Sequence, residues 1–229
     1  MIKVLKNIKP YYIAILIDIV ISYGYLRIME FEDINIMYQT IFGGNPLNGV
    51  MLKGLFIMNL SLLQLINIDF IVFYVDNLES LSIRYGSRDD FLSALLKGSF
   101  MISGGFVLLI YLIWLLIDII FNSIVDFHAI NIDVIIIIGR VYLFCIIIVL
   151  FQILLLLKTA KTNTYITITC ISIVLAFISN YNFPFGILPK LSSTYNNWIN
   201  VVFNILLIAF LIIIIRKMNL RKELISNEY

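Results

Sequence analysis

The sequence predicts an all-α protein that lies in a membrane and crosses it about six times. Hydrophobic residues make up 62% of the 229 residues and charged residues 13%. A soluble domain, in contrast, is about half apolar and about a quarter charged. The mean hydropathy is +1.02. A soluble core could not hold this many Ile, Leu and Phe side chains, so lipid is the expected solvent for most of the chain.

Six apolar runs have lengths close to the ~20 residues that cross a ~30 Å hydrocarbon core as a helix. A basic segment, residues 1–9, precedes them and is expected to lie at the membrane surface as a short interfacial helix. We expect residues 1–229 to form a single transmembrane domain. The predicted spans are residues 10–28, 51–75, 98–121, 133–157, 164–179 and 198–215.

Lysine and arginine are unevenly distributed among the polar segments. Most of them lie in residues 1–9, 76–97, 158–163 and 216–229. Residues 29–50 are acidic and contain neither Lys nor Arg. Basic residues mark the cytoplasmic side of membrane proteins, so the pattern predicts that both termini lie in the cytoplasm.

Two loops on the predicted outer side have compositions of their own. Glycine and proline punctuate residues 29–50, which predicts a turn-rich loop. Residues 180–197 contain two prolines, several aromatic residues and almost no charge. That composition is typical of an interfacial or re-entrant segment rather than a loop in water.

The longest polar interruption, residues 76–97, is expected to be a structured cytoplasmic loop. Apolar residues alternate with charges there, which predicts one or two short amphipathic helices, broken near Gly86, on the membrane surface. Such a helix can offer an apolar anchor and orienting charges to a partner protein. The simpler alternative is that the loop only lies on lipid. The candidate partner-binding residues are Arg84, Tyr85, Arg88, Asp89 and Phe91.

Four charged residues fall inside apolar runs: Asp18, Asp69, Asp118 and Arg140. Each costs roughly 2.5–3.5 kcal/mol at mid-membrane, so these side chains should face the bundle interior or pair. We expect Asp118 and Arg140 to pair, or to share a polar pocket, near the outer leaflet. Asp18 is the most central and is the best candidate for a proton or ion relay. Structural pairing, or solvation near an interface, is the alternative for all four.

Other patterns predict contacts between helices. The third run opens with small residues, beginning at Gly98, that would let another helix approach closely. The second run carries Asn59, Ser61, Gln64 and Asn67, whose side chains could bond to neighbouring helices.

The motifs of common enzyme classes are missing from the sequence. There is no GxxxxGK[ST] phosphate loop, no HExxH and no GxSxG, and His128 is the single histidine. We therefore expect a non-catalytic chain without its own cofactor or metal. Cys145 and Cys170 lie in apolar runs and are expected to be small buried hydrophobes. The net charge of +2 is too small to predict nucleic-acid binding.

The string IRYGSRDDFLSALLKG, residues 83–98, resembles the coupling-loop sequence of type-2 ATP-binding-cassette exporter permeases from low-GC Gram-positive bacteria, with an R-[YF]-x-[ST]-R core. The layout of six spans, with a structured loop after the second, is also similar. The resemblance implies a coupling helix that docks on a separate ATPase, which binds ATP and magnesium. It further implies a second membrane subunit, a cargo of amphipathic or hydrophobic peptide, and location in the bacterial cell membrane. The small size and the charges within spans depart from the family.

Two other functions stay open on the sequence. One is an ion- or proton-coupled secondary transporter or channel that uses Asp18 and Asp69. The other is a bacteriocin-immunity membrane protein that acts by binding.

Overall fold

The computed structural model describes residues 9–30, 34–42, 50–77, 87–122, 132–178 and 194–226. Every regular element in these ranges is an α-helix, which confirms the predicted class. The helices are α2 (Lys9–Ile28), α3 (Ile34–Ile41), α4 (Val50–Asp76), α6 (Arg88–Asn122), α7 (Ile132–Leu156), α8 (Lys161–Ile178) and α9 (Thr194–Ser226).

Four helices are long and apolar enough to cross a membrane, which supports the membrane character of the chain. Their apolar stretches are Val50–Tyr74, Asp89–Ile120, Ile135–Leu156 and Val201–Met218. They coincide with the second, third, fourth and sixth predicted spans. Helices α2 and α8 have 20 and 18 residues and occupy the places of the other two spans. Those two spans stay a prediction.

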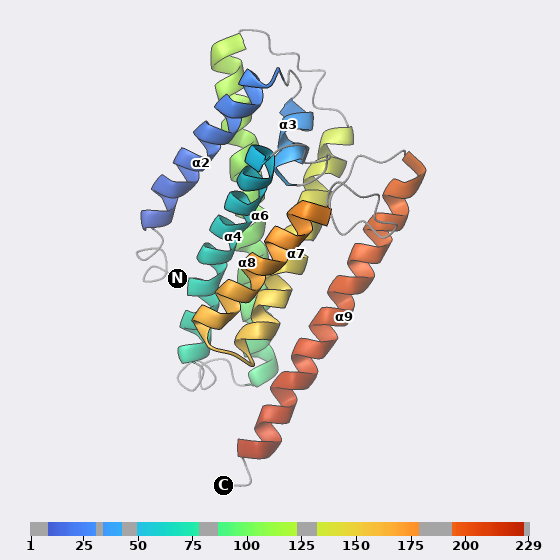
Figure 1. The fold of residues 1–229 in the computed structure, drawn as a ribbon. Coiled ribbons are helices and arrows are strands. Elements are labelled where there is room, and N and C mark those ends of the chain that lie inside the picture. The colour runs from blue at the N-terminus through green and yellow to red at the C-terminus, as the bar shows by residue number, and fades with distance from the viewer. Residues whose placement is uncertain are drawn as a thin grey trace.

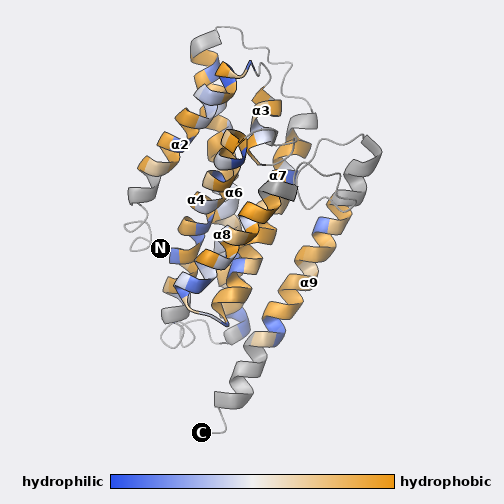
Figure 2. Cartoon of the chain, viewed as in Figure 1, coloured by the Kyte–Doolittle hydropathy of each residue, from blue (hydrophilic) through white to orange (hydrophobic). Residues whose placement is uncertain are grey.

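The long helices form a bundle in which successive members run in opposite directions (Figure 1). Apolar residues cover most of their length (Figure 2). Helix α4 lies at the centre, because it contacts α2, α3, α6, α7 and α8. Its apolar stretch is 61% buried, against 17% for that of α9. Helix α9 packs chiefly against α7 and leaves much of its apolar surface outward.

The small residues at the start of the third predicted span allow close helix contacts, as expected. A Cβ atom added at Gly98 would lie 2.3 Å from the ring of Phe70 on α4. One added at Gly104 would lie 3.3 Å from the ring of Tyr142 on α7. The Tyr142 hydroxyl also donates a hydrogen bond to the carbonyl of Phe100 over 3.3 Å. Helix α6 is thus fitted to α4 and α7 through positions without a bulky side chain.

The first loop differs from its prediction, because residues 34–41 form α3. Met37, Tyr38, Ile41 and the following Phe42 are almost fully buried. The Tyr38 hydroxyl donates a 2.8 Å hydrogen bond to the carbonyl of Val107 on α6. Apolar residues at 34, 37, 38 and 41 have the spacing of one helix face. The glycines and proline that predicted a loop lie after that face.

The third predicted span begins earlier than expected. Residues 88–97 are not a separate surface helix but the first turns of α6, which has 35 residues. Ser87 caps its start: its Oγ accepts the Asp90 N–H over 3.1 Å and donates to the Asp90 carboxylate over 2.6 Å. Ser87 is therefore an N-cap residue that satisfies one free backbone N–H of the first turn. Thirty-five helical residues extend about 52 Å, well beyond a hydrocarbon core of ~30 Å.

Helix α9 is also longer than its predicted span, since it continues through the basic tail to Ser226. Residues 1–8, 78–86 and 179–193 lie outside the described residues. The interfacial N-terminal segment and most of the predicted re-entrant segment fall there.

Candidate functional site

A polar cluster joins three helices in the middle of the bundle. The Gln64 side-chain amide on α4 donates a 2.9 Å hydrogen bond to the Ser172 hydroxyl on α8. Gln152 on α7 donates a 2.8 Å bond to the backbone carbonyl of Gln64. All three side chains are fully buried. The predicted interhelical role of Gln64 is confirmed, whereas Gln152 and Ser172 were not singled out from the sequence.

The neighbouring asparagines of α4 bond within their own helix. Asn59 donates to the carbonyl of Leu55 over 2.9 Å, and Asn67 donates to that of Leu63 over 3.0 Å. Both are fully buried. Among the described residues nothing donates to the side-chain oxygens of Asn59, Gln64, Asn67 and Gln152. The centre of the bundle therefore holds hydrogen-bond acceptors that could serve a water or a solute.

Asp18 lies on the buried face of α2 and is 2% exposed. Its Oδ1 accepts a 3.3 Å hydrogen bond from the Ser22 hydroxyl. Its Oδ2 is buried and accepts no hydrogen bond from any described residue. An ionised carboxylate without a cation is costly in such a place, so a proton or a cation would stabilise it.

Asp69 has a different environment from Asp18. It forms an ion pair with Lys161, the first residue of α8, and the two side chains are 28% and 51% exposed. Asp69 lies two turns from the end of α4, where the short connection from α7 enters α8. The ion pair with Lys161 favours a structural role for Asp69 near the membrane interface over a role in a relay with Asp18.

Asp118 bonds to the first predicted span instead of the fourth. Its carboxylate forms an ion pair with Arg27 and accepts a 2.9 Å hydrogen bond from the Tyr23 hydroxyl. The Arg27 Nε donates to the Tyr23 oxygen over 3.2 Å, and its guanidinium lies 5.4 Å from the centre of the Tyr23 ring. These three side chains tie α2 to α6. The expected partner, Arg140, is not the one that binds Asp118 here.

The depth of the residues in the bundle explains why Asp118 pairs with Arg27 and not with Arg140. Asp118 and Arg27 both lie in the last turns of their helices, and these ends lie at the same end of the bundle (Figure 1). Arg140 is eight residues into α7, about 12 Å along the helix axis, and is 5% exposed. Arg27 could have been found in the sequence, because it ends an apolar run as Asp118 does.

The predicted partner-binding residues have different surroundings. Asp89, like the adjacent Asp90, is exposed in the first turn of α6. Phe91 is 3% exposed and packs on Tyr74 of α4, with ring centres 5.7 Å apart. Phe91 is therefore a core residue in this structure rather than an exposed anchor. Arg88 begins α6, and Arg84 and Tyr85 lie outside the described residues.

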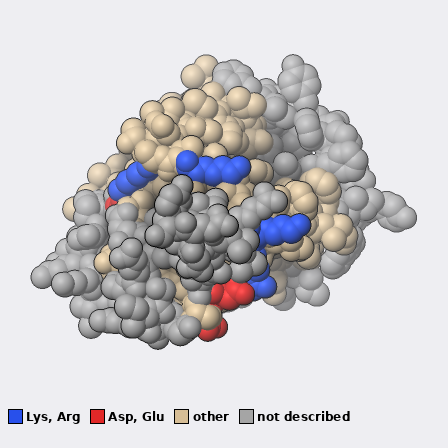
Figure 3. Space-filling model, turned by 90° about the horizontal axis from the view of Figure 1, so that it is seen from below, with Lys and Arg blue, Asp and Glu red and all other residues tan. Residues whose placement is uncertain are grey.

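Basic side chains gather at the end of the bundle where α6 starts. Figure 3 views this end and shows blue patches across it, with acidic side chains beside them. The structure thus collects cations from three segments that are distant in the sequence. The exposed basic residues on these segments are Lys97, Lys158, Lys161, Arg216 and Lys217.

No group of three or more His, Cys, Asp or Glu residues that could hold a metal ion occurs in the described part of the chain. Cys145 is fully buried, as expected for a small core residue. Cys170 is exposed on α8, contrary to that expectation.

We compared the chain with protein-family models, curated proteins and solved structures. No family model, curated protein or solved structure matches it.

Proposed function

We propose that this chain is the membrane subunit of an ATP-driven exporter and that it binds a separate ATPase at the end of the bundle where α6 begins. The observation that carries the proposal is the start of α6. It is a capped helix end with exposed Asp89 and Asp90, at the basic end of the bundle. The likeness of residues 83–98 to an exporter coupling loop points to the same place.

The proposed topology has six spans, with both chain termini in the cytoplasm. The concentration of Lys and Arg at one end of the bundle supports this orientation, because cytoplasmic ends of membrane proteins are basic. With α2 starting in the cytoplasm, the proposed topology has the ends of α4 and α9 and the start of α6 on the cytoplasmic side, in keeping with the alternating helix directions.

In this proposal the chain makes no covalent chemistry. The ATPase binds and hydrolyses ATP, and its conformational change reaches the bundle through α6. The first turns of α6 are continuous with its membrane-crossing part. A helix transmits a displacement along its axis, and α6 contacts both α4 and α7. A second membrane subunit and an amphipathic peptide cargo complete the proposed exporter.

The first prediction tests the docking end. We expect Arg84→Glu combined with Arg88→Glu to weaken co-purification with the proposed ATPase partner by at least tenfold. Loss of a desolvated charge contact costs about 2–5 kcal/mol. Membrane insertion should persist, which reporter fusions on both sides of the membrane can check first.

The matched control is Lys158→Glu, an exposed cation in the α7–α8 connection at the same end. Lys161 is unsuitable because it pairs with Asp69. We expect the control to retain the ATPase within about twofold of the unmodified chain. Equal retention by the double variant, or no ATPase bound by the unmodified chain, would contradict the proposed docking role.

A second candidate function is proton- or cation-coupled transport through Asp18. The observation that favours it is the buried Asp18 carboxylate, whose Oδ2 accepts no hydrogen bond from the described residues. Buried acids within membrane spans are common in proton relays. The pairing of Asp69 with Lys161 removes Asp69 from this proposal.

For this candidate, we expect Asp18→Asn to abolish voltage-driven proton uptake by proteoliposomes that contain the chain, because the amide cannot release a proton. A pH-sensitive dye inside the vesicles measures the uptake. Asp69→Asn serves as the control and should keep most of the flux. Proton uptake by the Asp18 variant at the unmodified rate, or no flux with the unmodified chain, would refute proton coupling through Asp18.

A further inference from the structure

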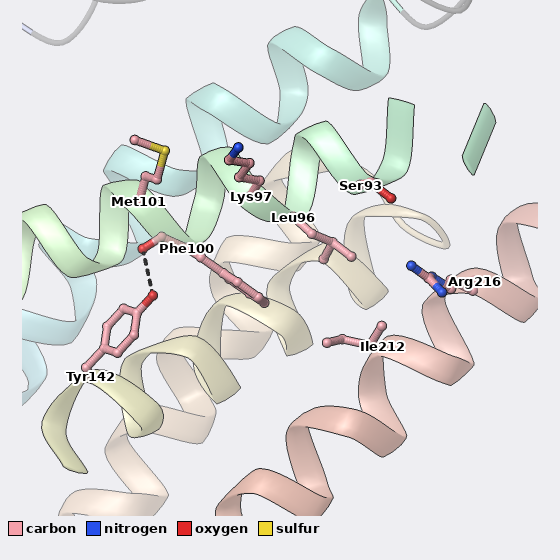
Figure 4. Close-up of a pocket in the computed structure, with 8 residues that line it drawn as sticks. All are labelled: Ser93, Leu96, Lys97, Phe100, Met101, Tyr142, Ile212 and Arg216. Carbon is pink, nitrogen blue, oxygen red and sulfur yellow. Dashed lines mark hydrogen bonds between the residues drawn. The ribbon is translucent and has the colours of Figure 1, made fainter. Parts of the chain in front are cut away.

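A groove lies between α6, α7 and α9 at the basic end of the bundle. Its volume is about 350 Å³. Ser93 and Phe100 of α6 and Ile212 and Arg216 of α9 are among the residues that line it. In Figure 4 the Arg216 guanidinium points from α9 toward Ser93, while Phe100 and Ile212 lie deeper between the helices. The groove therefore has a polar end and an apolar interior.

Two cations line the groove, Lys97 on α6 and Arg216 on α9, and both are exposed. Neither forms an ion pair within the described part of the chain, whereas Arg27 and Lys161 are each bound to an aspartate. Among the residues that the structure describes, no acidic one lines the groove. In Figure 4 Arg216 points toward Ser93, whereas the Lys97 amine points away from both. An arginine directed at a hydroxyl suits an anionic oxygen group such as a phosphodiester.

The rest of the groove is apolar and opens toward the surface that lipid would cover. Phe100 and Ile212 are half-buried, and Met101 at the edge is 66% exposed. The Tyr142 hydroxyl is bound to the Phe100 carbonyl, which closes the inner wall. A free phosphate ion would leave these apolar surfaces without a partner, whereas a phospholipid would cover them with its acyl chain.

We propose that this groove binds one anionic phospholipid, with its phosphate at Arg216 and Ser93 and an acyl chain along Phe100, Met101 and Ile212. Because α9 touches α6 much less than it touches α7, the lipid fills a gap in the contact between α9 and α6. The proposal depends on the membrane character of the chain and not on the ATPase partner.

The test uses the full chain purified in neutral detergent. Native mass spectrometry follows titration with phosphatidylglycerol, with phosphatidylcholine of the same acyl chains, or with inorganic phosphate. We expect a tightly bound phosphatidylglycerol, weaker phosphatidylcholine and no retained phosphate ion. Arg216→Gln should weaken phosphatidylglycerol binding about fivefold. Lys97→Gln should weaken it less, by about twofold, because its amine points away from Arg216 and Ser93.

Lys217→Gln is the matched control, because Lys217 is an exposed cation next to Arg216 that does not line the groove. It should bind phosphatidylglycerol within about twofold of the unmodified chain, and Arg216→Lys should fall between the unmodified chain and Arg216→Gln. Melting temperatures measured without added lipid show that each variant is folded. Equal binding of the two lipids, displacement of the lipid by inorganic phosphate, or an equal loss with Lys217→Gln would each overturn the proposal.

Discussion

Gly98→Leu is expected to destabilise the bundle by about 3 kcal/mol, because there is no room for a side chain at this position. Its Cβ would lie 2.3 Å from the end of the Phe70 ring. Phe70 is 9% exposed and packs on Tyr74 at 4.7 Å between ring centres, so the ring cannot easily turn aside. Helix α6 would have to move away from α4, and the contacts between these two central helices would be lost.

Gly105→Leu is the control on the same helix. Gly105 is exposed, and no atom lies within 4 Å of a Cβ added there. Leucine has a higher helix propensity than glycine, so this change should be neutral or stabilise by up to about 1 kcal/mol. Thermal unfolding in detergent, followed by circular dichroism, separates the two variants. A melting temperature of Gly98→Leu at or above that of the unmodified chain would mean that α4 and α6 are not packed as described.

Asp118→Leu is expected to cost about 1–3 kcal/mol, because it leaves Arg27 charged and partly buried and removes the acceptor of the Tyr23 hydroxyl. Breaking a fully buried pair by removing one partner costs about 3–5 kcal/mol. We expect less here, since the Arg27 and Asp118 side chains are 25% and 20% exposed and water screens them. The loss should appear mainly as release of α2 from α6.

The double variant Arg27→Leu/Asp118→Leu should be more stable than Asp118→Leu alone, because it also removes the guanidinium that lost the Asp118 carboxylate. The same comparison of melting temperatures completes a double-mutant cycle. Asp69→Leu gives the contrast: its pair with Lys161 is more exposed, so its loss should cost less than about 1 kcal/mol. Additive effects at Arg27 and Asp118 would show that the pair contributes no coupling energy.

The helices could be predicted from the sequence because apolar runs of this length have few alternatives in a membrane. The role of Gly98 could also be predicted, since a small residue in such a run has few other uses. Arg27 was a candidate partner of Asp118 on depth, because both lie near the ends of apolar runs, but the sequence does not tell that α2 and α6 are neighbours. Helix α3 was not predicted because the glycine- and proline-rich residues that follow it indicated a loop for the whole segment, although residues 34–41 have an amphipathic pattern. The continuity of α6 was missed because Gly86 was expected to break a helix that begins only at Arg88.

The central position of α4 and the peripheral position of α9 imply unequal tolerance to neutral sequence drift. Most substitutions on the outward face of α9, at positions such as Val202, Leu206 and Ile213, exchange one lipid-facing hydrocarbon for another. On α4, fully buried residues such as Phe56, Leu60 and Leu63 touch other helices and constrain one another. Homologous chains should therefore diverge fastest along α9, and its sequence should be the least informative guide to common ancestry.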